Sequence, residues 1–554
     1  MKFVKTLIWN LYFTILAVNV HGQQTVGLFK TSNEVSEGYV LVAPLFYTKA
    51  YLINNCGESV HEWNFDTSSG PLYLLEDGRL LRTGWDTDTQ FKAGGVTGYL
   101  ELLDWESNII WSYKISNAQE SLHHDVFRMQ NGNILATVWE RKTKEDVLNA
   151  GRNPDLFSEE IFSEKVIELK PIDENTYEIV WQWSTWDHLI QEYDPELINY
   201  GNVTEHPELL NINYTSDLAE GRDWIHFNSI DYNPELNLIL LSARHFNEIW
   251  IIDHSTTTEE AAGHSGGDYK KGGDLLYRWG NPRAYNHADN QQLFGQHDVR
   301  WIMGSSLLEI KLFNNGFNRS PNHSYIETIT PVLNEENEFL TGTDGTYLPS
   351  NSEQLYTQTD ENFYSSITSG SQLLKEGKNL LVTLGASGHC YEVELETGEV
   401  LWEYVSPVTG QGPQPQGSNV VSPDPTKSNT LFKVWKYDAD LLGDYSDQLA
   451  PDPKPVELNP LASPCLVASV RKPSENPVSV YPSITRDIIN IDSGYPEVNL
   501  DYMIYSMQGH LVAGGILNSA HTNINFRSQP SGIYFVVIQY LGGDEKYVFR
   551  VKKN

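Results

Sequence analysis

The chain has 554 residues, too many for one compact sandwich and enough for several domains or one large repeat architecture. Its formal charge of −35 at pH 7 argues against nucleic acid and anionic membrane surfaces as general partners. Aromatic residues make up 12% of the chain, and its 41 Gly and 26 Pro supply turns throughout. This composition favours short strands joined by many turns, and we expect an all-β protein.

Residues 1–22 have the pattern of a secretory signal peptide. Lys2 and Lys5 give a positive start, residues 7–20 form an apolar stretch, and Val20-His21-Gly22 offers a cleavage site before Gln23. The stretch is too short and too interrupted for a membrane span, and no later segment qualifies as an integral membrane segment. We therefore expect a protein exported through the periplasm, either secreted or held at the cell surface.

A repeated phrase of strand, acidic or Gly turn, and strand ending in Trp runs through most of the chain. Its copies lie at residues 51–63, 99–111, 166–183, 249–279 and 390–404. A second hairpin phrase lies at residues 74–80, 129–135 and 374–380. Two alternating hairpins predict four-stranded blades, about six of them, with the fifth poorly defined around residues 324–340. The Trp residues that close the hairpins are expected in the core. We predict a six-bladed β-propeller over residues 23–470.

The pattern changes after a linker rich in Pro and Ser at residues 471–477. Residues 478–554 then predict a separate small β-sandwich. This tail resembles the C-terminal sorting domain of proteins exported by the type IX secretion system of Bacteroidetes. The resemblance lies in residues 480–483 (VYPS), 529–534 (QPSGIY) and the basic end at 550–554, although the usual start is Tyr-Pro-Asn-Pro. It implies the type IX secretion machinery as a partner.

The chain has three cysteines, Cys56, Cys390 and Cys465. They allow at most one disulfide, with one thiol left over. Cys56 and Cys390 occupy similar places in two repeats, so we expect both to be buried as small apolar residues. No CxxC or HExxH spacing occurs, so the sequence contains no local metal motif.

Histidines stand at the starts of three similar strand-like segments. They are the His123-His124 pair, His226 and His297, and each precedes an apolar run. Three equivalent positions in a repeated unit suggest that separate repeats direct imidazoles at one centre. Imidazole is a nucleophile and a proton carrier near neutral pH, so such a cluster is a candidate active site.

The segment around His226 contains two further polar groups. Residues two apart share a face of a strand, so Asn228 is expected to point the same way as His226. An antiparallel return strand would bring Arg244 beside the start of the first strand. Together these groups offer the donors and the fixed positive charge that an oxyanion of phosphate or sulfate needs.

The other histidines leave a choice open. In an extended strand only one of His123 and His124 can face a shared centre. Matching His124-Asp125 to His297-Asp298 favours His124, whereas matching His123-x-Asp125 to His226-x-Asn228 favours His123; we favour His124. Three imidazoles could also form a zinc site. Arg244 would repel that cation, so we expect no metal and no cofactor here.

At these residues the chain resembles the bacterial arylsulfate sulfotransferases that work without the nucleotide sulfate donor. The resemblance covers roughly residues 40–470 by motif matching. Its carriers are residues 123–135 (HHDVFRMQNGNIL), 223–245 (DWIHFNSIDYNPELNLILLSARH), 295–302 (GQHDVRWI), 363–404 and 432–437 (FKVWKY).

The resemblance implies a six-bladed propeller whose active site lies near the central channel. In that family a histidine accepts the sulfuryl group of a phenolic sulfate ester and passes it to a phenol. By motif, His297 would be the nucleophile that becomes sulfohistidine, and His226 and Arg244 would bind the sulfuryl oxygens. Asn228 would lie close by, and His124 or His123 would complete the site. The implied partners are a small-molecule aryl sulfate donor and a phenolic acceptor.

Two other functions are compatible with the sequence. One is a non-catalytic exported propeller that binds glycans or proteins through loops such as residues 334–358. The other is a sulfatase, which would use water as acceptor and release inorganic sulfate without a phenol.

Overall fold

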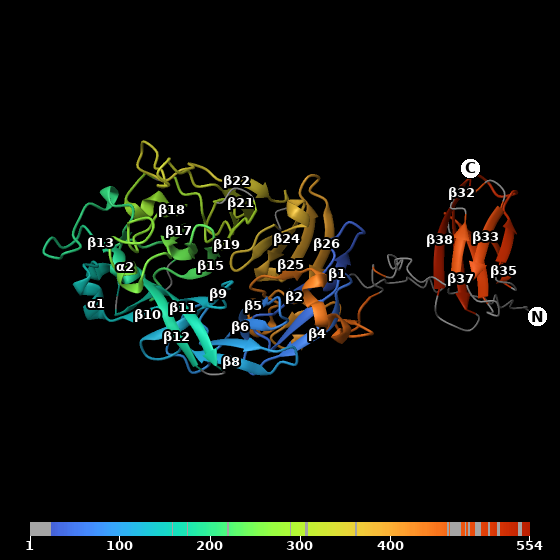
Figure 1. Cartoon of the computed structure of the whole chain (residues 1–554), viewed down its shortest axis with the longest axis horizontal. Helices are drawn as coiled ribbons and strands as arrows, with labels where there is room; N and C mark the ends of the chain where they lie inside the picture. Colours follow the sequence, from blue (N-terminus) through green and yellow to red (C-terminus); the bar gives the residue numbers. More distant parts are fainter. Residues whose placement is uncertain are drawn as a thin grey trace, which may run out of the picture. The chain divides into compact units, whose positions relative to one another are not determined.

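Figure 1 shows the computed structural model of the chain, which falls into two compact units, residues 1–465 and 466–554. The structure describes residues 24–461 except 158, 174–175, 219–220, 289, 305–307 and 360–362. Beyond these it describes residues 465, 478–481, 484–485, 488–493, 500–507, 510–517, 521–540 and 546–553. The predicted signal peptide and the predicted linker at 471–477 lie outside the described residues. The two units are described separately below.

The first unit is all-β, and its described strands form six antiparallel sheets of four or five strands. Three sheets each consist of four consecutive strands. The first contains β5 (Ser69–Leu74), β6 (Leu80–Gly84), β7 (Tyr99–Leu103) and β8 (Ile109–Lys114), and the second contains β15 (Phe227–Asn233), β16 (Leu238–Ala243), β17 (Glu248–Asp253) and β18 (Tyr277–Trp279). The third contains β19 (His297–Trp301), β20 (Ile310–Asn314), β21 (Tyr325–Ile329) and β22 (Glu353–Tyr356). A fourth has the order β12 (Thr176–Ser184), β11 (Ile161–Asp173), β10 (Ile134–Lys142), β9 (Glu120–Arg128).

The remaining two sheets join the beginning of the unit to its end. β1 (Gly27–Lys30) pairs with β26 (Val400–Val405) of the sheet β23 (Gly370–Leu374), β24 (Asn379–Leu384), β25 (His389–Glu394), β26. β2 (Tyr39–Val42), β3 (Lys49–Ile53) and β4 (Glu58–Asn64) lie between β29 (Trp435–Tyr437) and β30 (Lys454–Pro455). Two-stranded pairs are β13 (Leu189–Ile190) with β14 (Leu210–Asn211), and β27 (Val408–Thr409) with β28 (Gly412–Pro413).

Helices in the described residues are short. Two are α-helical, α1 (Lys144–Asn149) and α2 (Thr258–Ala261). The 3₁₀ segments are η1 (Pro154–Leu156), η2 (Thr185–His188), η3 (Val203–Glu205), η4 (Arg244–Phe246), η5 (Pro282–Tyr285), η6 (Lys375–Gly377), η7 (Gly385–Ser387), η8 (Pro425–Lys427) and η9 (Ala439–Gln448). No helix in the described part of the chain is long and apolar enough to cross a membrane.

The first strands of successive sheets contact one another: β5 contacts β9, β9 contacts β15, β15 contacts β19, and β19 contacts β23. The Trp residues that close the repeated hairpins are buried between sheets, as predicted: Trp63, Trp111, Trp183, Trp279 and Trp402. Burying an aromatic side chain removes about 150–250 Å² from water, worth about 4–6 kcal/mol as an upper bound. These buried side chains contribute to the packing between the sheets.

The cysteine prediction is wrong for Cys56. Cys56 forms a disulfide with Cys465, 409 residues further along the chain, with 5.6 Å between the Cα atoms. Cys390 is the buried thiol. Sequence spacing could not reveal this pairing, because the partner lies beyond the last strand of the unit.

The second unit contains two described sheets. One has the order β31 (Val478–Tyr481), β33 (Ile488–Ser493), β36 (His521–Asn525). The other has the order β32 (Ile484–Thr485), β38 (Lys546–Lys553), β37 (Gly532–Tyr540), β34 (Leu500–Ser506), β35 (Leu511–Leu517). A single apolar core draws on both sheets, for example Ile491 of the first and Val536 of the second.

Candidate functional site

The three histidine-bearing segments lie at the starts of the first strands β9, β15 and β19, and each start is irregular. The β9–β10 pairing shifts between Ala136 and Val138, so residues 123–125 bulge from the ladder. The β15–β16 pairing shifts just after Phe227, and the β19–β20 pairing shifts just after His297. A bulge re-aims side chains that regular alternation would send to opposite faces. Strand alternation therefore does not predict where these histidines point.

His123, His124 and His226 converge on one centre. Their ring centroids lie 4.2 Å (His123–His124), 4.8 Å (His123–His226) and 5.7 Å (His124–His226) apart. One ring nitrogen from each lies within 4.8 Å of the other two. The expectation that only one of His123 and His124 can face the centre is wrong, because the bulge in β9 brings both rings to it.

Hydrogen bonds place the proton of each of these three rings on Nδ1. The Nδ1–H groups donate to Glu164 Oε1 (from His123, 3.0 Å), to the Gly95 carbonyl (from His124, 3.2 Å) and to Asp223 Oδ2 (from His226, 2.6 Å). The Nε2 atoms of His123 and His124 are buried and have no hydrogen-bond partner among the described residues. In the neutral rings Nε2 carries the lone pair.

Burial sets the protonation state of this cluster. Desolvation holds the pKa of His123, His124 and His226 well below the ordinary value, and for His124 and His226 the neighbouring imidazoles add to the effect. The rings are therefore neutral at neutral pH. An anion brought against them would favour their protonated forms.

Arg244 reaches the same centre from the end of β16. The Arg244 amide donates to the carbonyl of His226 at 3.0 Å, so the return strand brings Arg244 beside the start of the first strand, as predicted. Its Nη1 donates to Nε2 of His245 at 3.0 Å. The His245 ring stacks on His226 with 4.8 Å between centroids. His245 was not predicted as a site residue, although it directly follows Arg244.

His297 has a fixed tautomer. Its Nδ1–H donates to Oδ1 of Asn315 at 2.8 Å and to the Gly295 carbonyl at 3.0 Å. The Nδ2 of Asn315 donates to the carbonyls of Ser365 and Thr368, so its Oδ1 is the acceptor. Nε2 of His297 therefore carries the lone pair, and it accepts the amide N–H of Thr368 at 3.2 Å.

Burial, followed by the charge of Arg244, lowers the pKa of His297 to about 3. The ring is thus neutral at neutral pH, the form in which an imidazole can act as a nucleophile. The Phe432 ring links the two parts of the site, with its centroid 4.9 Å from that of His124 and 6.4 Å from that of His297.

Asn228 has a different orientation from the one predicted. His226 adopts a left-handed backbone conformation, with φ of 61°, and precedes the strand, so the two residues are not on one regular strand face. The Nδ2 of Asn228 donates to the carbonyl of Gln296 at 2.7 Å. Asn228 is fully buried and positions the segment that carries His297.

A family model described as arylsulfotransferase (ASST) matches residues 103–408, more than half of the chain. The chain belongs to the arylsulfotransferase family. A second model, described as a secretion system C-terminal sorting domain, matches residues 479–549. The chain therefore carries a type IX sorting tail, and it is exported to the cell surface or the medium.

Solved structures resemble the chain only distantly. A protein of unknown function from Bacteroides caccae is 10% identical, with a TM-score of 0.39 over 72% of this chain and 99% of that one. The β-propeller domain of Cps50 (Swd1) from Myceliophteria thermophila is 11% identical, with a TM-score of 0.31 over 69% and 90%. The periplasmic gluconolactonase of Pseudomonas aeruginosa is 9% identical, with a TM-score of 0.33 over 67% and 97%. The search of curated proteins gave no match.

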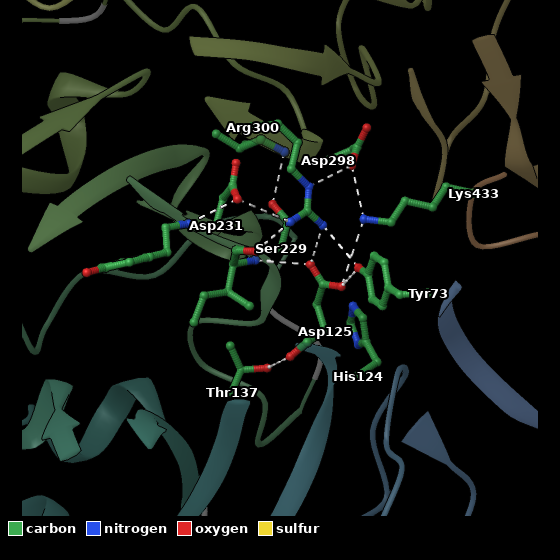
Figure 2. Close-up of polar contacts among 12 residues, drawn as sticks. Tyr73, His124, Asp125, Thr137, Ser229, Asp231, Asp298, Arg300 and Lys433 are labelled. Atoms are coloured by element: carbon green, nitrogen blue, oxygen red, sulfur yellow. Dashed lines mark hydrogen bonds and ion pairs between the residues drawn. The ribbon is translucent and has the colours of Figure 1, made fainter. Parts of the chain in front are cut away.

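A buried network of charges lies next to the site histidines and is shown in Figure 2. Asp125, which follows His124, accepts from Arg300 Nη2 at 2.8 Å. Asp298, which follows His297, accepts from Arg300 Nε at 3.1 Å and from Lys433 Nζ at 3.0 Å. The amide of Ile230 in β15 also donates to Asp125 at 3.0 Å. One network therefore ties together the strands that carry the site histidines.

Balanced charge keeps this network ionised. Burial alone would raise the pKa of Asp298, but Lys433, Lys311 and Arg300 together hold it well below the ordinary value. Lys311 Nζ lies 3.6 Å from Asp298 Oδ2. A buried charge is stable only when it is paired in this way.

The charge of Arg244 bears on whether these histidines would hold an anion or a metal ion. One ring nitrogen from each of His123, His124 and His226 could hold zinc, and so could the group of Asp223, His226 and His245. Burial is the main cause that lowers the pKa of His226, and the neighbouring imidazoles and the charge of Arg244 add to it. The positive charge of Arg244 would also repel a bound cation. A monoanionic ester is attracted by that charge instead.

Proposed function

We propose that this arylsulfotransferase moves a sulfuryl group from a phenolic sulfate ester to a phenolic acceptor through a sulfohistidine at His297, with ping-pong kinetics. The observation that carries the proposal is the tautomer of His297, whose Nδ1–H is held by Asn315 and Gly295 so that Nε2 is the nucleophilic atom. The reaction needs no nucleotide donor and no metal.

In this proposal Arg244 and His226 hold the sulfuryl oxygens, and His123 and His124 complete the pocket. Arg244 supplies the permanent charge, and preorganised donors of this kind commonly give the largest share of catalysis. The histidines can donate from Nε2 only after taking up a proton, since their Nδ1–H groups are already engaged. Binding of the donor ester is therefore coupled to uptake of a proton by the cluster.

The first transfer breaks the bond between sulfur and the aryl oxygen. Nε2 of His297 attacks sulfur in line and forms the N–S bond, while the aryl oxygen leaves with the bonding electron pair. A phenol titrates near 10, so its oxygen takes the proton from a protonated His124 or His226 as it leaves. In the second transfer an acceptor phenol gives its proton to the cluster, its oxygen attacks sulfur, and the N–S bond breaks.

The amide of Thr368 must release Nε2 of His297 before the attack. Thr368 and Ser369 have φ of 52° and 88°, left-handed values that cost of order 1 kcal/mol or more each for residues with side chains. Once released, the Thr368 N–H can donate to a sulfuryl oxygen. The strained segment is thus suited to a small displacement during catalysis.

We also infer that the six sheets are the blades of a six-bladed propeller over residues 23–470, and that residues 478–554 form a β-sandwich. The contacts between first strands, and the two sheets that join the start of the unit to its end, support the propeller. The predicted signal peptide at 1–22 and linker at 471–477 complete this domain organisation.

The test exposes the protein to 4-nitrophenyl sulfate, with and without a phenol, followed by mass spectrometry of its peptides. Without a phenol we expect a sulfuryl adduct on the peptide containing His297 and release of one equivalent of nitrophenolate. Continued release should need the phenol, and His297→Ala should show neither adduct nor release. His389→Ala is the matched control, because His389 lies in β25 and pairs with Glu403. Sulfate release without phenol would indicate a sulfatase, and no release at all would indicate a binding propeller.

A further inference from the structure

A second group of histidines and a carboxylate lies outside the sulfuryl site. His188 ends η2, directly after β12. His264 and Asp274 lie in the Gly-rich insertion between β17 and β18, which the proposed reaction does not use. One ligand atom from each of the three residues lies within 4.8 Å of the other two. The group therefore joins neighbouring sheets.

The contacts of this group call for a positive charge between its members. Nδ1 of His188 and Nδ1 of His264 both face Oδ1 of Asp274, at 2.9 and 2.7 Å. Nε2 of His188 lies 2.9 Å from the carbonyl of Ala261, which can only accept, so the proton of a neutral His188 is on Nε2. Nδ1 then directs a lone pair at a carboxylate oxygen, and a second proton or a metal ion is needed between them.

We propose that His188, His264 and Asp274 bind a zinc ion, with water in the remaining position. Two imidazoles and a carboxylate form a ligand set that zinc takes in tetrahedral sites with an open position. A histidine that ligates a metal commonly donates its other N–H to a backbone carbonyl, as His188 does to Ala261. The geometry thus shows both the ligands and the group that orients one of them.

The site has one rigid ligand and one adjustable ligand. The His188 ring is fully buried and stacks on Trp183 at 5.7 Å between centroids. The His264 side chain is 62% exposed. Zinc–nitrogen bonds of about 2.0–2.1 Å put tetrahedral ligand atoms about 3.3 Å apart, so the present contacts must lengthen by about half an ångström. Movement of the exposed His264 side chain can supply this.

Water can reach the proposed ion from outside. His264 lines a cavity of about 610 Å³, together with Trp186, Asp187 and His206. The insertion already contacts the neighbouring sheet through Trp183, whose indole N–H donates to the carbonyl of Gly273 at 2.6 Å. A bound zinc would strengthen this junction, because a ligand that binds only the folded state stabilises it.

The test titrates Zn²⁺ into the full chain after removal of metals with a chelator, and follows binding by calorimetry and metal content. We expect wild type to bind one zinc at this site, and His264→Ala to bind it at least about tenfold more weakly. His206→Ala is the matched control, since His206 is exposed, lines the same cavity and pairs with Glu208 outside the group. His226→Ala tests whether the ion sits among the central histidines instead.

A second variant and a spectroscopic readout distinguish the loss of a zinc ligand from misfolding of the variant. Asp274→Asn should weaken zinc binding as His264→Ala does, and Co²⁺ in wild type should show the visible absorption of a tetrahedral site that both variants lose. Transfer by His264→Ala should match wild type. Equal zinc affinity in wild type and in both variants would overturn the proposal, and so would loss of binding in His226→Ala alone.

Discussion

The Oδ1 atom of Asn315 lies 2.8 Å from Nδ1 of His297, while Nδ2 of the same Asn315 holds the carbonyls of Ser365 and Thr368. One amide side chain therefore sets the tautomer of the proposed nucleophile and anchors the segment whose N–H occupies its Nε2. Orientation of His297 and access to it are linked through a single residue.

Replacing Asn315 should impair catalysis more than binding. In Asn315→Ala the ring loses its strongest orienting partner, and we expect kcat to fall by about 10–100-fold, as for other buried partners that orient an imidazole. KM for the donor should change little, because Arg244 is untouched. Steady-state kinetics with 4-nitrophenyl sulfate measure both quantities.

Asn315→Asp is the informative control for this prediction. It keeps an acceptor for Nδ1–H but loses the donor to the Ser365 and Thr368 carbonyls, and its charge should raise the pKa of His297. We expect the acidic limb of the kcat/KM profile to move to higher pH. A wild-type profile and wild-type kcat in both variants would contradict a positioning role for Asn315.

Much of the site could be predicted because its parts are local in sequence. The three histidine segments stand out from their repeats, and the hairpin places Arg244 beside His226. The bulges could not be predicted, since they depend on pairing with β10, β16 and β20. For the same reason the sequence could not show that both His123 and His124 face the centre.

The missed residues have two different explanations. His245 follows Arg244 directly, and that adjacency was an available signal. Asn315 and Thr368 approach His297 from positions 18 and 71 residues away, and nothing in their local sequence indicates that contact. The all-β composition and the buried Trp residues, by contrast, follow from hydrophobic patterning that any sheet of this kind must satisfy.

Arg244 should act mainly on the donor ester. Arg244→Ala removes the fixed positive charge at the site, and loss of such a charge-assisted contact is worth about 1.5–3 kcal/mol, or about 10–150-fold in kcat/KM for the donor. Arg244→Lys should recover only part of this, because an ammonium lacks the planar fork of the guanidinium. Kinetics with donor and acceptor varied in turn distinguish the two substrates. An effect confined to the phenol acceptor would contradict the assigned role.

The buried histidines should make the protein sensitive to acid. Histidine in the unfolded chain titrates near 6.5, whereas burial lowers the pKa of His245 and of His297 to about 3 in the folded protein. Between these values the unfolded chain binds protons that the folded protein does not. Their stabilising contribution is therefore complete above pH 6.5 and is lost as pH falls toward 3, by about 1.4 kcal/mol per pH unit for each histidine.

Urea unfolding at a series of pH values between 7 and 4 checks this prediction, and His245→Gln isolates one histidine from the carboxylates that titrate in the same range. The free energy of unfolding of the variant should fall less steeply with acid, by about 1.4 kcal/mol per pH unit. Parallel profiles for variant and wild type would show that His245 does not titrate as its burial requires.

The buried charges beside the site should be costly to break one at a time. Asp298 accepts from Lys433 and Arg300 and from the amide of Ser371 at 2.9 Å. In Asp298→Asn the Lys433 and Arg300 cations stay buried but lose their carboxylate partner. We therefore expect the free energy of unfolding to fall by about 3–5 kcal/mol. Transfer should fall as well, because Asp298 directly follows His297 and fixes the start of β19.

Lys30→Met provides the matched control for this change. Lys30 pairs with Glu399 at 3.2 Å, and both side chains are exposed (42% and 61%), so losing the pair should cost about 0–1 kcal/mol. In the double variant Asp298→Asn/Lys311→Met, one uncompensated cation is removed, and part of the lost stability should return. Denaturant unfolding compares all three variants with wild type. A cost for Asp298→Asn no larger than that of Lys30→Met would mean that the network does not hold the strands of the site in place.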